Sequence, residues 1–163
     1  MKIYFAADHA AFELKNILLA FVRDELKFDV TDCGAFAFDA NDDYPEFIGA
    51  AARKLSEDVV AEKDARAIVL GASGQGEAMV ANRFPGVRCA LYYGAAGEQT
   101  DVAGKKLDMI ASCREHNNAN ALSLGARFLS TDDAKAVVKR WLSIPFSGEE
   151  RHARRIKQID ELV

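Results

Sequence analysis

Cysteine is scarce in this chain, and its arrangement excludes two classes of small protein. The 163 residues contain only Cys33, Cys89 and Cys113, with no C-x-x-C pair. An odd number of widely spaced cysteines fits neither a disulfide framework nor a structural zinc site. We therefore expect a reduced, cytoplasmic protein that holds no metal ion.

Long apolar runs and an excess of basic charge are missing as well. No run approaches the roughly 18 apolar residues that a membrane span requires, and no leader with a basic head and an apolar core opens the chain. The formal net charge is −4, and the basic residues form no stripe. We expect neither a membrane nor a nucleic acid as partner, whereas a small anionic ligand is compatible with this charge.

The length and the pattern of apolar residues predict one α/β domain over residues 1–163. About 150 residues is an ordinary size for a single hydrophobic core. Short apolar runs alternate with segments of helical periodicity, which is typical of a parallel sheet covered by helices on both faces. We expect strands at 2–7, 28–31, 66–70, 87–92 and 121–124, helices at 12–26, 43–60, 103–115, 132–142 and 149–162, and a short helix that ends at residue 83.

The segment Gly71-Ala72-Ser73-Gly74-Gln75-Gly76-Glu77, called the glycine loop below, directly follows the apolar run 67–70. Its three glycines allow several backbone N–H groups to converge on one anion. The carboxylate of Glu77 stands at its end. Donors for an oxyanion beside a carboxylate that can move a proton are the two parts needed for chemistry next to a carbonyl, so the loop indicates an enzyme.

Other functions of a glycine loop fit less well. A phosphate-binding P-loop needs Lys-Ser/Thr after its last glycine, where this chain has Glu77-Ala78. A dinucleotide fingerprint needs a third small residue where Met79 stands, and no acidic residue closes a neighbouring strand at the expected interval. A plain turn between a strand and a helix is a further alternative, although it would need neither Ser73 nor Glu77.

Two groups of polar residues accompany the loop. Asp8 and His9 end the first predicted strand, and because the carboxyl ends of parallel strands meet at one edge of a sheet, both should lie beside the glycine loop. Asp8 could equally cap the first helix. Arg151, Arg154 and Arg155 lie at i, i+3 and i+4 of the last predicted helix, on a face that can grip a phosphate or simply meet solvent.

The histidines, Tyr44 and Asn117 can each be interpreted as site residues or as structural residues. His9, His116 and His152, the only histidines, stand in polar sequence, which favours the surface or a site over the core. Tyr44 and Asn117 could serve packing and capping. We expect Trp141 in the core.

Seven separated segments, in one order along nearly the whole chain, resemble those of the ribose-5-phosphate isomerase B family, whose broader group includes galactose-6-phosphate isomerase subunits. Any one of them would be a weak signal, whereas the ordered set is specific. The segments are Ala7-Asp8-His9-Ala10 with Glu13-Leu14-Lys15, Asp43-Tyr44-Pro45, the glycine loop, Ala81-Asn82, Glu115-His116-Asn117, Leu124-Gly125-Ala126-Arg127 and Arg151-His152-x-x-Arg155-Ile156.

The resemblance implies a three-layer, Rossmann-like α/β fold with a five-stranded parallel sheet. It also implies a homodimer or homotetramer whose active sites are shared between subunits, with the C-terminal helix 149–162 at a dimer interface. Neither a metal ion nor an organic cofactor is implied. The reaction would interconvert ribose 5-phosphate and ribulose 5-phosphate, a step of the pentose phosphate pathway, through a cis-enediol intermediate.

The resemblance implies roles for single residues too. His116 would help to open the sugar ring, and Asp8 would bond the ring oxygen or hydroxyl. Contacts to the sugar and its phosphate would come from Tyr44, Asn117, Arg127, Arg151 and Arg155, with His9 close to the phosphate.

Members of this family take the proton-carrying base from one of two positions. One form has a cysteine at the first position of the glycine loop, where this chain has Gly71, and the other has a glutamate at the position of Glu77. This chain resembles the glutamate form. Ser73 and the backbone N–H groups of residues 74–76 would hold the enediolate oxygen. A glutamate shielded from water can have its pKa raised toward the working pH, which suits a group that removes and returns a proton.

One departure from the family leaves the substrate open. Between residues 90 and 115 the chain has roughly a dozen more residues than typical members, including Gly94-Ala95-Ala96-Gly97 and Gly104-Lys105-Lys106, which predicts an excursion beside the substrate entrance. Sugar phosphates of four or six carbons, such as galactose 6-phosphate or allose 6-phosphate, are alternatives. A non-catalytic sugar-phosphate-binding subunit is another, and the retained Glu77, His116 and Asp8 speak against it.

Overall fold

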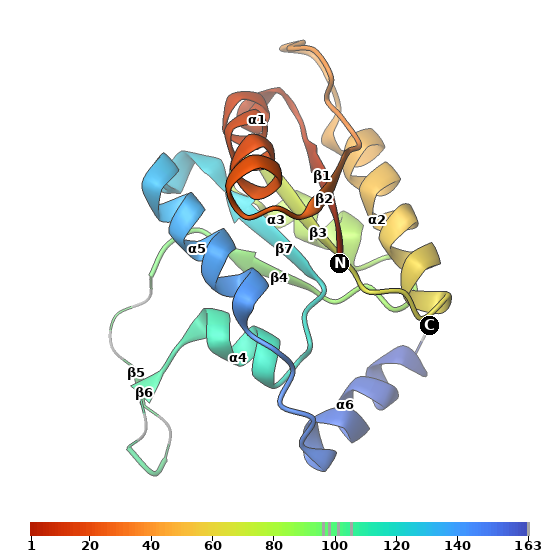
Figure 1. The fold of residues 1–163 in the computed structure, drawn as a ribbon, viewed down its shortest axis with the longest axis vertical. Helices are drawn as coiled ribbons and strands as arrows, with labels where there is room; N and C mark the ends of the chain where they lie inside the picture. The colour runs from red at the N-terminus through yellow and green to blue at the C-terminus, as the bar shows by residue number, and fades with distance from the viewer. Residues whose placement is uncertain (96, 98, 101, 105, 163) are drawn as a thin grey trace.

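The main sheet of the protein is parallel and lies between two layers of helices. The structure, a computed structural model, describes residues 1–95, 97, 99–100, 102–104 and 106–162. Five strands form this sheet (Figure 1), in the spatial order β2 (Asp29–Asp32), β1 (Lys2–Ala7), β3 (Ala65–Gly71), β7 (Ala121–Gly125) and β4 (Cys89–Tyr92). The predicted α/β fold with a five-stranded parallel sheet is confirmed.

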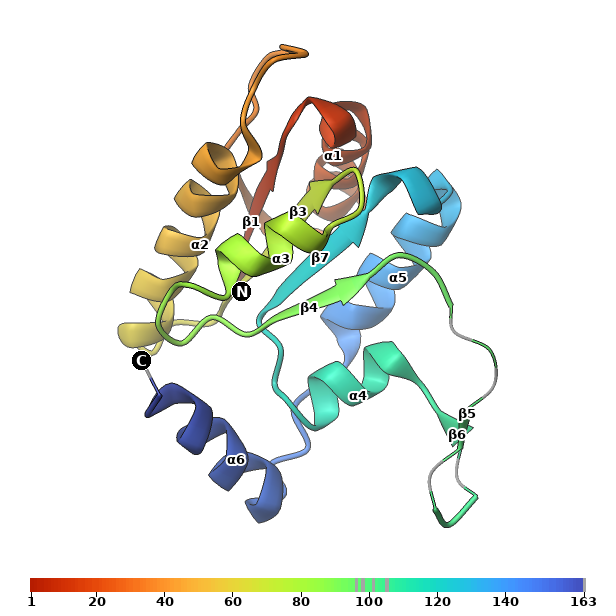
Figure 2. The same cartoon turned by 180° about the vertical axis from the view of Figure 1, so that it is seen from behind.

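Helices cover both faces of the sheet (Figures 1 and 2). On one face lie α1 (Phe12–Ala20), α4 (Met109–Glu115) and α5 (Thr131–Ser143), and on the other lie α2 (Tyr44–Val60) and α3 (Gln75–Ala81). Short helical turns are η1 (His9–Ala11), η2 (Phe21–Glu25), which continues α1, and η3 (Ala126–Phe128). The predicted 12–26 helix thus corresponds to α1 and η2 together.

The alternation of side chains along β1 divides the core into two halves. Ile3 and Phe5 are completely buried in the half that also contains Trp141 of α5, as expected for that tryptophan. Tyr4 and Ala6 point to the other face and pack with Ile48 of α2. Because neighbouring residues of a strand face opposite sides, a strand covered on both sides must be apolar along its whole length.

Strand pairing aligns the ends of the central strands. Ala7 of β1 pairs with Leu70 of β3, Gly71 pairs with Gly125 of β7, and Leu124 pairs with Tyr92 of β4. The segments that follow these strands therefore leave the sheet at one edge, called the carboxyl edge below. The segments that lead into the strands lie at the opposite, amino edge.

The predicted 103–115 helix begins later than expected. Its first helical residue is Met109, because Asp108 caps α4 by accepting a hydrogen bond from the Ala111 N–H at 2.8 Å. Before it, β5 (Gln99–Thr100) and β6 (Lys106–Leu107) pair antiparallel, so part of the predicted excursion is a small hairpin. Residues 96, 98, 101 and 105, which belong to that excursion, lie outside the described residues.

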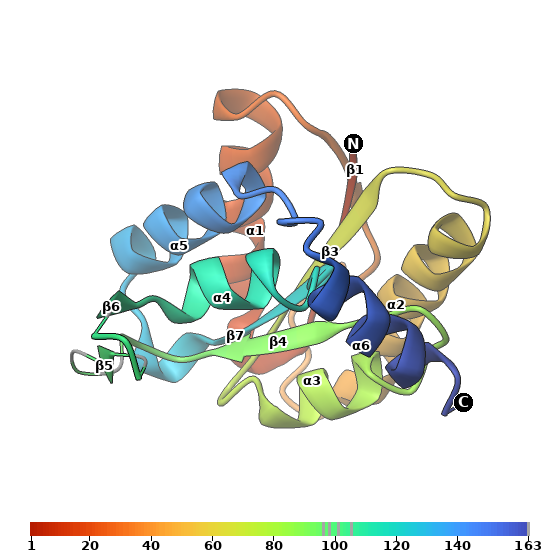
Figure 3. The ribbon, with the colours of Figure 1, turned by 90° about the horizontal axis from the view of Figure 1, so that it is seen from below.

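The last helix has few contacts with the rest of the chain. Helix α6 (Glu150–Asp160) confirms the 149–162 prediction to within two residues at each end. Figure 3 shows it beside the start of β4, where Ile159 lines a cavity with Val87 and Cys89. His152 is its only buried residue. Within the described part of the chain, no helix is long and apolar enough to cross a membrane.

Candidate active site

The glycine loop bends tightly against the end of β7. Gly74 has φ +76°, and a Cβ there would lie 2.7 Å from Leu91 and 3.0 Å from the backbone of Gly125. Only glycine combines this conformation with so close an approach. The Ser123 hydroxyl donates to the Gly74 carbonyl at 2.6 Å and fixes the loop from the sheet side.

Several donors of this loop are left unused by the protein. The N–H groups of Gly74 and Gly76 have no acceptor among the described residues, and the Gln75 N–H meets only the Ser73 hydroxyl, at a long 3.4 Å. Gln75 itself is exposed, whereas Ser73 is half-buried. The loop therefore offers a set of donors to an anion, as the sequence predicts.

Glu77 is buried at the start of α3, and only 4% of its surface is exposed. Its carboxylate lies so close to the Cα of Gly71 that any Cβ at position 71 would overlap it. Burial raises the pKa of Glu77, its own backbone N–H lowers it, and the charge of Asp8 raises it further. The environment thus favours a carboxyl group that can hold a proton closer to neutral pH than an ordinary glutamate.

Asp8 and Tyr44 complete this part of the site from other elements. Asp8 is buried at the end of β1 and accepts a hydrogen bond from the Ala10 N–H at 3.0 Å, so it does cap η1. The capping interpretation and a role in the site are compatible, because its charge also reaches Glu77. The ring of Tyr44, at the start of α2, packs against Gly76, where a Cβ would lie 2.7 Å from the phenol oxygen.

His9 and Arg127 lie at the same edge. The Nδ1 of His9 is 2.6 Å from Asp42 Oδ1, and the positive charge of Arg127 acts on the His9 ring. Arg127 is exposed on η3, which is tied to the glycine loop because its N–H donates to the Ala72 carbonyl at 3.1 Å. We therefore group Asp8, His9, Tyr44, the glycine loop and Arg127 as the carboxyl-edge group.

The other predicted residues lie elsewhere in the chain. His116 ends α4 and precedes β7, so it belongs to the amino edge, and its ring stacks on that of His152 in α6 with centroids 4.4 Å apart. Figure 2 shows α6 at the far end of the molecule from the loop between β3 and α3. The predicted residues His116, Asn117, Arg151 and Arg155 form, with His152, what we call the amino-edge group.

The amino-edge group carries mostly positive or neutral side chains. Arg151 and Arg155 are exposed on α6, and Arg151 lies 2.9 Å from Glu149. His152 is buried, contrary to the expectation from its polar sequence, because α6 folds back onto the end of α4. Burial lowers the pKa of His152, and the nearby charges of His116 and Arg151 lower it further. One chain therefore holds half of the predicted site at each edge.

Comparisons with known proteins show which family the chain belongs to. A family model described as Ribose/Galactose Isomerase matches residues 3–159. The chain belongs to this family. It is 40% identical over 161 residues to the ribose-5-phosphate isomerase B of Mycolicibacterium paratuberculosis, with 99% of this chain and 91% of the relative covered. The ribose-5-phosphate isomerase B of Mycobacterium tuberculosis is 38% identical over 161 residues, with 99% and 89% covered.

Solved structures agree with the family assignment. The crystal structure of ribose-5-phosphate isomerase B from Mycoplasma genitalium with bound ribulose-5-phosphate has a TM-score of 0.82 and 34% identity, with 99% of this chain and 95% of that chain covered. The type B ribose 5-phosphate isomerase of Trypanosoma brucei has a TM-score of 0.81 and 28% identity, with 99% and 98% covered. The resemblance stated from the seven segments is confirmed, and the chain is an isomerase of this family.

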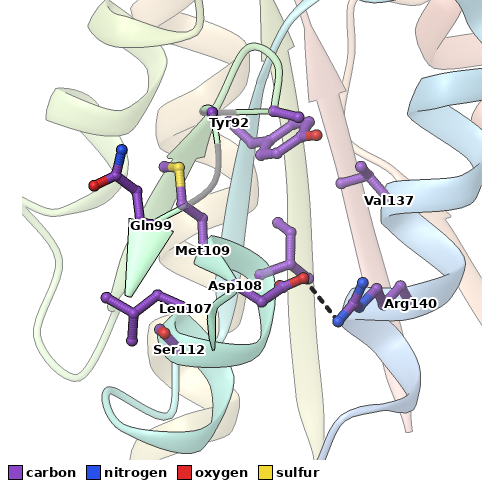
Figure 4. A pocket seen from close by; sticks show the side chains of 11 residues that line it. Tyr92, Gln99, Leu107, Asp108, Met109, Ser112, Val137 and Arg140 are labelled. Carbon is purple, nitrogen blue, oxygen red and sulfur yellow. Dashed lines mark ion pairs between the residues drawn. The ribbon is translucent and has the colours of Figure 1, made fainter. Parts of the chain in front are cut away.

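A cavity of about 440 Å³ lies away from both groups in this isomerase. Tyr92 of β4, the β5–β6 hairpin and Val137 of α5 line it, and the ion pair of Asp108 with Arg140 at 2.8 Å closes one side (Figure 4). None of the predicted site residues lines it. The β5–β6 hairpin therefore helps to form a mostly apolar hollow beside β4.

Two side-chain contacts near the carboxyl-edge group were not predicted from the sequence. Asp42 binds His9. The neighbouring Asp43, which precedes α2, makes no side-chain cap bond. Lys15 is completely buried and donates to Asp32 at 2.6 Å and to the Ala35 carbonyl at 2.9 Å. No periodicity predicts either contact, because each joins residues that are distant in the chain and meet only in the folded protein.

Proposed function

We propose that the protein interconverts ribose 5-phosphate and ribulose 5-phosphate, with Glu77 as the base that carries the proton between C1 and C2. The observation that carries this proposal is the buried Glu77 carboxylate beside unused backbone donors. Relatives that cover nearly the whole chain are named ribose-5-phosphate isomerase B, which supports the five-carbon substrate. The cysteines of the described chain are free, which supports a cytoplasmic setting.

The chemistry requires both parts of the glycine loop. An α-proton is too weakly acidic to be removed unless the developing oxyanion is held by preorganised donors, an effect of several kcal/mol. We assign this role to the Ser73 hydroxyl and the N–H groups of residues 74–76. Burial raises the pKa of Glu77, so its carboxylate is a stronger base, and the acid it becomes can return the proton to the neighbouring carbon.

The remaining carboxyl-edge residues would hold the sugar. Asp8 would bond the ring oxygen or a hydroxyl, since it is buried next to Glu77 and keeps acceptor capacity beyond its one cap bond. Tyr44 would pack against the substrate over Gly76. Arg127 would bind the phosphate, with His9 close to it.

We further propose that the amino-edge group of a second copy completes each site. One chain holds His116, Asn117, Arg151 and Arg155 at the edge opposite to Glu77, so these residues can reach a sugar bound at the glycine loop only from another subunit. His152 is the one buried residue of α6, and the exposure of the rest of this helix supports a place for it at a dimer interface. In that arrangement His116 would open the ring, and the two arginines would bind the phosphate.

The first experiment follows the reaction and the proton together. Chelator-treated protein is mixed with ribose 5-phosphate in deuterated water, and NMR follows the formation of ribulose 5-phosphate, deuterium at its C1 and deuterium at C2 of the re-formed ribose 5-phosphate. Turnover that disappears in Glu77→Gln and persists in Glu57→Gln, an exposed glutamate of α2, is the expected result. Turnover that survives in Glu77→Gln would refute the base assignment.

A second experiment tests whether the site is shared. Glu77→Gln and His116→Ala, each inactive on its own if the assigned roles hold, are unfolded together and refolded in equal amounts. Random pairing gives one chain of each variant in half of the dimers. One of the two sites in each such dimer is intact, so about a quarter of wild-type activity should return. The pair Glu77→Gln and Asp8→Asn is the control, because both changes fall in one group and no mixed dimer regains a complete site.

The sugar chain length is the part of the proposal that the hairpin affects most. β4 leaves the sheet beside Gly125, where Tyr93 packs, so the β5–β6 hairpin follows directly from the carboxyl edge. A panel of four-, five- and six-carbon aldose phosphates, compared by kcat/KM, tests the preference. A higher value for a six-carbon phosphate such as allose 6-phosphate would replace the five-carbon assignment while keeping the mechanism.

A further inference from the structure

His9 is held by a neighbour that the proposed mechanism does not use. The Asp42 Oδ1 atom is 2.6 Å from His9 Nδ1 and also accepts the His9 backbone N–H at 3.0 Å. The Asp42 side chain is only 7% exposed, while that of His9 is 31% exposed. Two bonds to one oxygen fix both the backbone and the ring of His9, so this pair is more than a surface ion pair.

The contact decides which ring nitrogen is available. An ionised carboxylate can only accept, so Nδ1 must carry the hydrogen that lies between His9 and Asp42. The other nitrogen, Nε2, has no hydrogen-bond partner within the described ranges. The ring of Phe38 meets the His9 ring edge-on at 6.5 Å and limits its rotation. His9 is thus oriented with one nitrogen committed and one free.

A metal ion is the competing explanation for this cluster. Asp8, His9 and Asp42 offer ligand atoms that all lie within 4.8 Å of one another. However, ligands of a tetrahedral ion with bonds of about 2.0–2.1 Å are about 3.3 Å apart, whereas His9 Nδ1 and Asp42 Oδ1 are separated by 2.6 Å. The spacing is that of a hydrogen bond, and the test below includes the ion as an outcome.

The charges around His9 come from four elements. The hydrogen bond to Asp42 raises the pKa of His9, burial lowers it, the charges of Asp8 and Asp42 raise it, and Arg127 of η3 lowers it. Glu13 of α1 lines the same cavity as His9. The carboxylates outnumber the one cation, so the surroundings favour the protonated ring.

We propose that Asp42 is a positioning residue that holds His9 as a charged donor, with Nε2 free to bind the phosphate group of the substrate beside Arg127. This inference rests on the proposed function for the identity of the anion. Asp42 itself touches no substrate. It acts through His9, by fixing the ring and by stabilising the imidazolium, in the way that a carboxylate orients a histidine in other polar sites.

The direct test measures the titration of His9 in the full chain. Histidine ring signals are followed by NMR from pH 5 to 9, and the His9 signal is assigned by its loss in His9→Gln. In Asp42→Asn, which keeps the shape but not the charge, His9 should titrate about one pH unit lower, a tenfold fall in the ratio of protonated to neutral ring. Asp42→Ala, which removes both bonds, should shift it at least as far.

Asp39→Asn is the matched control, since Asp39 is an exposed aspartate of the same loop whose side chain accepts from Asn41. It should leave the His9 titration in place. Identical titration in the wild type and Asp42→Asn would overturn the proposal. A shift of the His9 signal on addition of one equivalent of Zn²⁺ would overturn it in favour of an ion site.

Steady-state kinetics are the second test of the role of Asp42. With ribose 5-phosphate, Asp42→Asn should raise KM severalfold above pH 7 and change kcat less, because binding of the anion is weakened rather than the proton transfer. A loss in kcat alone would count against a role in phosphate binding. The NMR titration needs no turnover, so a failure of the isomerase assignment and a failure of the Asp42 proposal remain distinguishable.

Discussion

Replacing Gly71 by alanine should disable the enzyme without changing any residue that reacts. Gly71 does not have a positive φ, so its backbone accepts a side chain. The new methyl group would overlap one oxygen and the carboxyl carbon of Glu77 and would lie 2.7 Å from the other oxygen, where ordinary contacts begin at 3.4 Å. The strain therefore falls on the Glu77 carboxylate, which has to move.

The size of the effect follows from that displacement. Clearing the methyl group requires a movement of about 1 Å or more, and a misplacement of that size costs about 100-fold in rate, or about 2.7 kcal/mol of barrier. The loss should appear in kcat, since the phosphate and sugar contacts of the other residues are untouched. KM should change by less than about threefold.

The assay compares four variants with ribose 5-phosphate as substrate. Gly49→Ala is the control, because its Cβ would meet Phe84 at an ordinary 3.8 Å, and it should keep full activity. Gly71→Ala with Glu77→Gln should be no slower than Glu77→Gln alone, since the first change acts only through the second residue. Full activity in Gly71→Ala, or additive losses in the double variant, would refute the reasoning.

Three further outcomes are expected. Arg155→Ala should raise KM for ribose 5-phosphate about tenfold or more with kcat nearly unchanged, because a charge-assisted contact to a dianion is lost, and weaker inhibition by inorganic phosphate checks it. Burial holds the pKa of His152 below its usual 6.5, so protonation favours the unfolded chain and the stability that neutral His152 contributes above pH 6.5 is lost as the pH falls. The Tm of the wild type should therefore drop more steeply below pH 6.5 than the Tm of His152→Gln. Parallel curves of Tm against pH would contradict this. Phe5→Ala, at a completely buried position, should lower the free energy of unfolding by about 3–5 kcal/mol in a urea titration, and a loss below about 1 kcal/mol would mean that the core closes around the gap.

Elements with strong local signals could be predicted nearly to the residue. The first strand was expected at 2–7 and is Lys2–Ala7, and the second helix was expected at 43–60 and is Tyr44–Val60. A continuous apolar run marks the strand, and Pro45 in the first turn marks the start of the helix. The 103–115 helix was wrong at its start, because helical spacing was followed through Gly104, which has φ +80°, and past the capping Asp108.

The residues of the site could likewise be predicted only where a local pattern marks them. Asp8 and the glycine loop could be placed together from sequence, because parallel strands deliver their ends to one edge whatever the side chains are. The burial of His152 and the contact of Asp42 with His9 could not be predicted in this way. The burial of His152 arises from a contact with His116, 36 positions earlier, and Asp42 reaches His9 across 33 positions of chain. Such contacts depend on how loops and the last helix return to the sheet.

The overlap between position 71 and the Glu77 carboxylate also constrains which residues these two positions can hold. A cysteine side chain at position 71 would claim the volume of the Glu77 carboxylate, so this chain cannot hold both. A side chain at position 71 would therefore have to be matched by a smaller residue at position 77. Gly71→Cys should be tolerated only together with a small residue at position 77.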